Sequence, residues 1–282
     1  MQNKIIFFGT SIFSVEVLEQ LKARGLIFDA IVTTVDKPKG RKLIMTPPPA
    51  KVWATENNVK VFQFEKLKDS IDELKNLNPD LFIVASYGKI IPQSILDLPK
   101  NGALNIHPSI LPEYRGASPL QTCILDDSKN IGVTIIKMDA EMDHGPIVAM
   151  KKVDVKNWPI NVLELKKLLG KEGSDILIAN LEGYLDGSLK LIEQDHSNAT
   201  FTKKITKADG EIDINGDQWK NYLKTQAFFG WPGTFFFTER HGKKIRVKIN
   251  SASFDKENNK MMIEKVTPEG GKEMAYADFL RG

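Results

Sequence analysis

The sequence predicts an α/β protein, with a mostly parallel sheet in its first part and a small β-rich, barrel-like module at its end. Strand patterns typical of burial on both faces occupy 4–9 and 81–85, and a further strand is expected at 28–34. An amphipathic helical segment follows the first run, so strand, helix and strand succeed one another at the spacing of a right-handed crossover. From about residue 201 the pattern changes to short segments separated by turn residues.

The composition is that of an ordinary globular protein. The 282 residues are 41% apolar and 27% charged, which suits one large domain with a small one, or two domains of moderate size. No stretch approaches eighteen apolar residues and no leader pattern opens the chain, so we expect no membrane span, no signal peptide and a cytoplasmic location. The single cysteine, Cys123, can form neither an intramolecular disulfide nor a cysteine-based metal site, and we expect it to pack in the core.

The formal charge of +3 is unevenly spread along the chain. Residues 201–282 carry 15 Lys and Arg against 11 Asp and Glu, which leaves 24 against 25 in the first 200 residues. This C-terminal excess of positive charge is compatible with a nucleic-acid partner but does not require one.

The first crossover gives little support to a dinucleotide site. The strand at 4–9 ends in the turn Gly9-Thr10-Ser11, and a helix follows with apolar residues at helical spacing, namely Phe13, Val17, Leu18 and Leu21. The turn holds one glycine, whereas a dinucleotide-binding turn has the pattern GxGxxG.

Residues 35–49 interrupt the α/β pattern with a long connection rich in proline and glycine. Its basic residues are Lys37, Lys39, Arg41 and Lys42. Connections of this length are unusual in compact α/β domains and are often functional. One interpretation is a solvated surface loop, and the other is a mobile basic arm that meets phosphates.

The next elements lead to a second strand end of interest. We expect a helix from the proline run at 47–49 through Glu56, a short strand at 60–62 and a helix near 70–77. The buried strand 81–85 then ends at Ser86-Tyr87-Gly88. In an open parallel sheet, ligands bind at the carboxyl ends of strands.

Asn105 and His107 form the most informative pair in the chain. They lie on a short apolar strand, 103–107, where alternation points both side chains to one face, and the strand ends at Pro108. An amide can donate a hydrogen bond to a developing oxyanion, and an imidazole can move a proton near neutral pH. The alternative is a strand end whose polar side chains cap the local backbone. The nearby Tyr87-Gly88 strand end favours a site.

A loop with three acids and a histidine, 139–146, joins the expected strands 131–138 and 147–153. Asp143 in this loop can orient an imidazole or pair with its charge. A plain acidic turn is the alternative. Metal binding by His107, Asp143 and His144 has little support, because paired or helical ligand spacing is missing.

The C-terminal part begins after a long helix predicted at 161–185. A helix near 217–228 precedes an aromatic run, which we expect to be mostly core, and a hairpin that pairs 234–238 with 244–250. The basic residues of that hairpin form either a phosphate-facing rim or a solvated surface. They are Arg240, Lys243, Lys244, Arg246 and Lys248.

The chain resembles the folate-dependent formyltransferases over nearly its whole length. Asn105-x-His107 with Ser109-Ile-Leu-Pro112 is similar to the family motif N-x-H…S-L-L-P, and Asp143 falls where the third catalytic residue belongs. The resemblance implies a Rossmann-like, mostly parallel formyltransferase domain over 1–200 and a small OB-like domain over 201–282. It also implies Asn105, His107 and Asp143 as catalytic residues, with 10-formyltetrahydrofolate as formyl donor and no metal. The implied folate-binding residues are Tyr87, Gly88, Ser109, Ile110, Leu111 and Pro112.

Further stretches resemble the branch of this family that acts on initiator methionyl-tRNA. They are the turn from Gly9-Thr10 to Phe13, the basic loop DKPKGRKL at 36–43, and 204–213 with Trp231-Pro-Gly. The resemblance implies that Lys37, Arg41 and Lys42 meet the tRNA. The C-terminal module, of roughly 80 residues, is shorter than is usual in the family.

Two other functions remain open from the sequence. One is a formyltransferase that acts on a small amine, such as glycinamide ribonucleotide or an amino-sugar nucleotide. The other is a non-catalytic RNA-binding protein on the same scaffold. Because no feature indicates stable oligomerisation, we expect a monomer.

Overall fold

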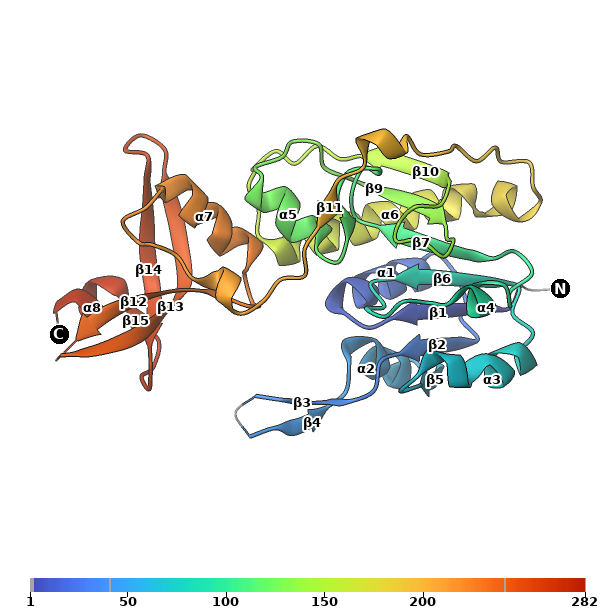
Figure 1. Cartoon of the computed structure of the whole chain (residues 1–282), viewed down its shortest axis with the longest axis horizontal. Coiled ribbons are helices and arrows are strands. Elements are labelled where there is room, and N and C mark those ends of the chain that lie inside the picture. The colour runs from blue at the N-terminus through green and yellow to red at the C-terminus, as the bar shows by residue number, and fades with distance from the viewer. Residues whose placement is uncertain (1–2, 41, 241, 282) are drawn as a thin grey trace. The chain divides into compact units, whose positions relative to one another are not determined.

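The computed structural model (Figure 1) describes residues 3–40, 42–240 and 242–281, which divide into two units. The first unit holds the chain up to Gly116, Asn130–Val153 and Lys166–Phe201, and the second holds Ala117–Lys129, Asp154–Leu165 and the chain from Thr202 onward. The domain boundary expected near residue 201 stays a prediction. By their contacts, two segments from the first 200 residues belong with the C-terminal unit.

The central sheet of the first unit is mostly parallel, as the sequence predicts. Within the described residues it has seven strands in the order β10-β9-β7-β6-β1-β2-β5. The strands from β7 to β5 run parallel, whereas β9 is antiparallel to both β7 and β10. The bounds are β1 (Ile5–Gly9), β2 (Ala30–Thr33), β5 (Lys60–Gln63), β6 (Leu81–Ala85), β7 (Ala103–His107), β9 (Gly132–Lys137) and β10 (Ile147–Lys152).

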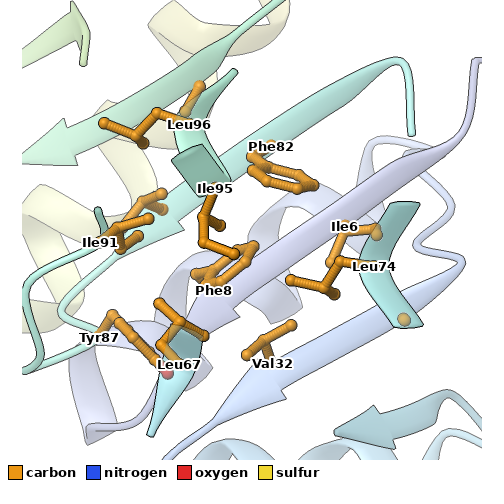
Figure 2. Packing of buried hydrophobic residues seen from close by; sticks show 13 residues of the cluster. Ile6, Phe8, Val32, Leu67, Leu74, Phe82, Tyr87, Ile91, Ile95 and Leu96 are labelled. Atoms are coloured by element: carbon orange, nitrogen blue, oxygen red, sulfur yellow. The ribbon is translucent and has the colours of Figure 1, made fainter. Parts of the chain in front are cut away.

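The apolar runs of the sequence become strands that are buried on both faces. Along β1, Ile6 and Phe8 point into one core cluster, in which the Phe8 ring lies 4.8 Å from Phe82 and 5.4 Å from Tyr87 between centroids (Figure 2). Side chains from the connections cover this face, among them Leu67, Leu74, Ile95 and Leu96. An uninterrupted apolar strand is therefore the pattern that this position requires.

Helix α6 packs against the opposite face of the sheet. A Cβ added to Gly173 in α6 would come within 2.6 Å of the Ile106 side chain and 2.9 Å of Val133, so the absence of a side chain permits this close approach. The helices that the first unit contains or shares are α1 (Ile12–Ala23), α2 (Pro49–Glu56), η1 (Leu67–Ser70), α3 (Ile71–Asn76), α4 (Gln93–Leu96) and α6 (Val162–Leu185).

Asp80, which directly precedes β6, forms hydrogen bonds with residues that precede β1 and β7. One carboxylate oxygen accepts from the Lys4 backbone N–H at 2.8 Å, and the other accepts from Lys100 Nζ at 2.7 Å. The hydrogen bond from Lys100, followed by that from Lys4, lowers the pKa of Asp80. Because the carboxyl side chain is only 17% exposed, we expect these contacts to contribute to stability.

We expect Asp80→Asn to lower the free energy of unfolding by about 1 kcal/mol at pH 7. A carboxyl whose pKa is lowered on folding stabilises the protein above its unfolded pKa, near 4, and loses that contribution as the pH falls through the lowered value. Urea denaturation at pH 7 and pH 3 should therefore show the difference shrinking in acid. Asp97→Asn is the matched control, and an Asp80→Asn effect of equal size at both pH values would contradict the assignment.

The basic connection contains a small hairpin, where the sequence had left open a solvated surface loop or a mobile basic arm. Strand β3 (Lys37–Lys39) pairs antiparallel with β4 (Ile44–Thr46), and the hairpin projects from the sheet (Figure 1). Its base is fixed by Asp36, which accepts from Lys51 Nζ at 2.8 Å and from Gln63 Nε2 at 2.7 Å. These two contacts, with that from Gln63 the larger, lower the pKa of Asp36.

The second unit contains a four-stranded antiparallel sheet in its described residues, which confirms the predicted β-rich module. Strand β12 (Thr234–Arg240) pairs with β13 (Lys243–Asp255) to form the predicted hairpin, with Thr234 opposite Ile249 and Thr238 opposite Ile245. The OB-like assignment stays a prediction. The remaining elements of this unit are α5 (Pro119–Leu125), η3 (Ala208–Gly210), α7 (Gln218–Ala227), β14 (Lys260–Pro268), β15 (Met274–Ala275) and α8 (Tyr276–Arg281).

The aromatic run is divided between the core and the surface of this unit. Phe228, Phe235 and Phe236 are buried, as expected, while Phe229 and Trp231 are exposed. The short elements not yet given are β8 (Arg115–Gly116), η2 (His196–Asn198) and β11 (Phe201–Thr202). Across the residues that are described, none of the helices has the length and apolar character needed to cross a membrane.

Candidate active site

Asn105 and His107 lie side by side at the carboxyl end of β7, with their side chains on one face of the sheet. The residue between them, Ile106, points to the opposite face and packs on Gly173. Strands β6 and β9 flank β7, with Val84 and Ile136 as neighbours of Asn105. Both polar side chains are therefore held on a rigid central strand, and both are buried.

The loop between β9 and β10 brings Asp143 to these two side chains. Asp143 Oδ1 accepts a hydrogen bond from Asn105 Nδ2 at 3.3 Å and lies 3.5 Å from His107 Nδ1. Its other oxygen, Oδ2, accepts from the backbone N–H of Gly116 at 2.7 Å. The structure thus brings all three predicted catalytic residues together around one carboxylate.

The amide of Asn105 has hydrogen-bonding capacity beyond its contact with Asp143. An amide nitrogen carries two hydrogens, and the hydrogen bond to Asp143 uses one of them. The second remains available for an oxygen of a bound substrate. Such a donor, fixed in a buried place, can stabilise negative charge that develops during a reaction.

The ring of His107 has an oxygen acceptor at each nitrogen. Nε2 lies 3.0 Å from the carbonyl oxygen of Tyr114, and Nδ1 faces Asp143. A carbonyl can only accept, so this contact assigns a hydrogen to Nε2. A hydrogen on Nδ1 would in turn point toward the Asp143 carboxylate.

The segment Ser109–Pro112, predicted to bind folate, forms a tight turn after β7. Thr134 of β9 fixes it, because the Thr134 hydroxyl donates to Ser109 O at 2.7 Å and accepts from Leu111 N at 3.1 Å. The side chains of Ser109, Ile110 and Leu111 are buried, and Leu111 packs with Ile136 and Ile147. The turn therefore offers a rigid wall next to Asn105 and His107.

Tyr87 and Gly88, which follow β6, lie in different surroundings: the Tyr87 side chain is in the core, and Gly88 adjoins open space. The Tyr87 ring points into the core beside Phe8 (Figure 2), and burial raises its pKa to about 12. Within the described chain, the buried Tyr87 hydroxyl has no hydrogen-bond partner. Gly88 has a φ of +81°, and a Cβ added there would meet no atom within 4 Å. Open space beside Gly88 fits a ligand at this edge, whereas the Tyr87 ring is committed to the core.

The predicted tRNA-binding residues lie on the β3–β4 hairpin. Lys37 and Lys42 are exposed, and Arg41 lies outside the described residues. The hairpin and the Asn105 cluster both belong to the first unit, but on different connections of the sheet. No group of metal-binding side chains is present among the residues described here.

Sequence reasoning missed Gln194, which contacts the Asp143 loop directly. Its amide lies within 3.0 Å of three backbone carbonyl oxygens of that loop. Gln194 lies in a polar segment after α6 and has neither a motif nor a periodic pattern around it. Contacts between residues about fifty positions apart leave no local signal in one sequence.

Comparisons with known proteins assign this chain to a class of enzyme. Residues 3–181 match the formyl transferase family. The chain therefore belongs to the formyl transferase family, whose members are folate-dependent enzymes. This membership favours an enzyme over the non-catalytic alternative.

The relatives by sequence narrow the class further. A methionyl-tRNA formyltransferase of Halalkalibacterium halodurans is 34% identical, over 99% of this chain and 94% of its own length. Another, from Thermotoga neapolitana, is 36% identical over 99% of this chain and 90% of its own. The resemblance to the methionyl-tRNA branch is thus confirmed.

Solved structures share the fold at lower identity. A methionyl-tRNA formyltransferase from Clostridium thermocellum superposes with a TM-score of 0.60 at 20% identity, covering 97% of this chain and all of that one. A 4-N formyltransferase from Francisella tularensis gives 0.64 at 20% identity, over 86% of this chain and 96% of that one. At this identity the likeness concerns the fold alone.

Proposed function

We propose that this enzyme transfers a formyl group from 10-formyltetrahydrofolate to the α-amine of initiator methionyl-tRNA. The observation that carries the proposal is the cluster in which Asp143 lies within 3.5 Å of both Asn105 and His107. The full-length relatives named methionyl-tRNA formyltransferases support this acceptor. We propose that the enzyme acts as a monomer in the cytoplasm.

The chemistry follows from the groups that surround the reacting atoms. The neutral α-amine attacks the formyl carbon, and the new C–N bond forms as the bond from that carbon to the folate nitrogen breaks. Asn105 donates a hydrogen bond to the formyl oxygen while it carries negative charge. His107, whose charge Asp143 balances, moves the proton lost by the amine to the departing nitrogen.

We propose that the donor occupies the edge of the sheet between Gly88 and the Ser109–Pro112 turn. Two features support this place. Gly88 adjoins open space, and the turn is held rigid by Thr134. In this proposal Tyr87 contributes through its backbone, since its ring belongs to the core.

We propose that the β3–β4 hairpin contacts the tRNA through Lys37, Lys42 and Arg41. The two described lysines are exposed and stand on a hairpin that projects from the sheet (Figure 1). A second basic surface lies on the β12–β13 hairpin, where Arg246 stacks 3.6 Å above the Phe235 ring and Lys244 lies 4.6 Å from that of Phe237. Cations over aromatic rings suit contact with phosphates and bases.

Lys37→Gln and Lys42→Gln are each expected to weaken tRNA binding without changing the single-turnover rate at saturating tRNA. Loss of one phosphate contact should reduce the slope of log binding constant against log salt concentration by about 1. Titrations at several salt concentrations measure that slope. The exposed Lys68, outside the hairpin, gives the control Lys68→Gln, and an equal effect of all three substitutions would argue against a hairpin contact.

The proposed function is tested by offering three amines in parallel. Purified enzyme with 10-formyltetrahydrofolate is given charged initiator methionyl-tRNA, free methionine or glycinamide ribonucleotide, and formylated product is measured. Transfer to the tRNA alone is expected. Transfer to a small amine alone would keep the chemistry but overturn the acceptor, and no transfer to any of them would overturn the proposed function.

A further inference from the structure

Asp143 adopts a backbone conformation that needs support from its surroundings. Its φ is +51°, in the left-handed region that residues with side chains rarely adopt. The loop after it is also tightly placed, because a Cβ added to Gly145 would lie 1.9 Å from the carbonyl oxygen of Lys137. Since such conformations persist only where contacts fix them, some group must hold this loop in place.

Gln194 is placed to hold the loop. Its side-chain nitrogen Nε2 lies 2.9 Å from the carbonyl oxygen of Asp143, 3.0 Å from that of His144 and 2.7 Å from that of Gly145. The residue is 5% exposed. Three consecutive carbonyls therefore converge on one buried amide, and this arrangement fixes the turn from which the Asp143 carboxylate projects.

Arg115 fixes the direction in which the Gln194 amide points. Arg115 Nη2 donates to Gln194 Oε1 at 2.7 Å, and a guanidinium can only donate. The amide oxygen must therefore face Arg115, so the amide nitrogen must face the carbonyls. A flipped amide would set donor against donor at Arg115 and acceptor against acceptor at the loop.

His144, a residue of the same loop, also contacts His196 outside it. The His144 ring stacks on the His196 ring, with centroids 4.0 Å apart and an angle of 2° between the planes. His144 Nδ1 lies 2.7 Å from Asp139 Oδ2, and His196 Nδ1 lies 2.8 Å from Arg115 Nη2. These contacts link the loop through His196 to Arg115, which also holds Gln194.

We propose that Gln194 is a positioning residue that keeps the Asp143 carboxylate beside Asn105 and His107. This inference rests on the proposed function for its kinetic consequence, but not for its structural one. Without the Gln194 amide, three carbonyls lose their shared donor and the loop is free to leave the left-handed conformation. The Asp143 carboxylate then moves away from Asn105, from His107 and from the Gly116 N–H.

The kinetic test uses Gln194→Met, which keeps the length of the side chain and removes the amide. We expect the single-turnover rate constant for formyl transfer to fall about 10- to 100-fold at saturating substrates, as for a misplaced catalytic group. In an Asp143→Asn background the same substitution should change the rate less than about 2-fold, because Gln194 acts through Asp143. Equal losses in both backgrounds would overturn the proposal, since a general structural defect acts independently of Asp143.

Gln218 supplies a matched control. Its amide also donates to two backbone carbonyls, of Ile214 at 3.0 Å and Gly216 at 2.9 Å, but in the second unit. Gln218→Met should lose a comparable amount of stability and leave the rate constant unchanged. If Gln194→Met does not fold, Gln194→Asn replaces it. Asparagine keeps the amide on a side chain one methylene shorter, and its effect is compared in the wild-type and Asp143→Asn backgrounds.

A second readout does not depend on activity. The Gly116 N–H donates to Asp143 Oδ2 at 2.7 Å, so its hydrogen exchange reports whether that carboxylate is in place. We expect this amide to exchange at least about 10-fold faster in Gln194→Met than in the wild type or in Gln218→Met. Such a change corresponds to a roughly tenfold larger equilibrium constant for local opening. Unchanged exchange would overturn the proposal, whether or not the wild type formylates methionyl-tRNA.

Discussion

Asn105→Ala is expected to lower the single-turnover rate of formyl transfer about 100- to 1,000-fold while the protein remains folded. The magnitude is that found when a preorganised donor to a developing oxyanion is removed. Asn105 is buried on β7 and keeps one amide hydrogen beyond its bond to Asp143. The loss should therefore fall on the rate constant at saturating substrates, not on the affinity for either substrate.

Rapid-quench measurement of formylated methionyl-tRNA, with thermal unfolding in parallel, checks this expectation. Asn180→Ala is a suitable control, because Asn180 Nδ2 also donates a hydrogen bond, in this case to the backbone carbonyl of Ile176 on helix α6. Asn105→Ala that retained near-normal single-turnover transfer would show that the amide has a structural role only.

The parallel part of the sheet could be predicted from the sequence because its strands carry the strongest local signal. Runs such as 5–8 and 81–85 are apolar at every position, which is the pattern that a strand buried on both faces requires. The pairing of Asn105 with His107 on one face follows in the same way from strand alternation. Their approach to Asp143 depends on a loop conformation that strand alternation does not fix. The residues of the loop left a plain acidic turn as the alternative, and the family resemblance favoured the approach.

The features that the sequence did not predict leave no distinctive local pattern in the residues that form them. The β3–β4 hairpin is built from Lys-Pro-Lys paired with Ile-Met-Thr, and lysine and proline are depleted in strands. Gln194 reaches the carbonyl of Asp143, 51 positions away, from a segment without regular structure. The Tyr87 ring packs in the core beside Phe8. The residue pattern at a strand end does not indicate whether a tyrosine there faces the core or a ligand.

The second large effect is expected at His107, where His107→Gln should reduce the single-turnover rate about 100- to 10,000-fold. The glutamine amide can still donate to the Tyr114 carbonyl, which lies 3.0 Å from Nε2 in the native protein. It cannot take up a proton near neutral pH. The substitution therefore separates the structural contact of the ring from its part in proton movement.

Comparison with His107→Phe completes the argument. Phenylalanine removes both the contact with the Tyr114 carbonyl and the proton transfer. If the ring acts mainly through its contact with Tyr114, His107→Gln should be much more active than His107→Phe. A ring that moves the proton makes the two variants similarly slow. Because His107 Nδ1 lies 3.5 Å from Asp143 Oδ1, adding Asp143→Asn to His107→Gln should then cost far less than it does in the wild type. Additive losses would instead mean that Asp143 serves Asn105 rather than the imidazole.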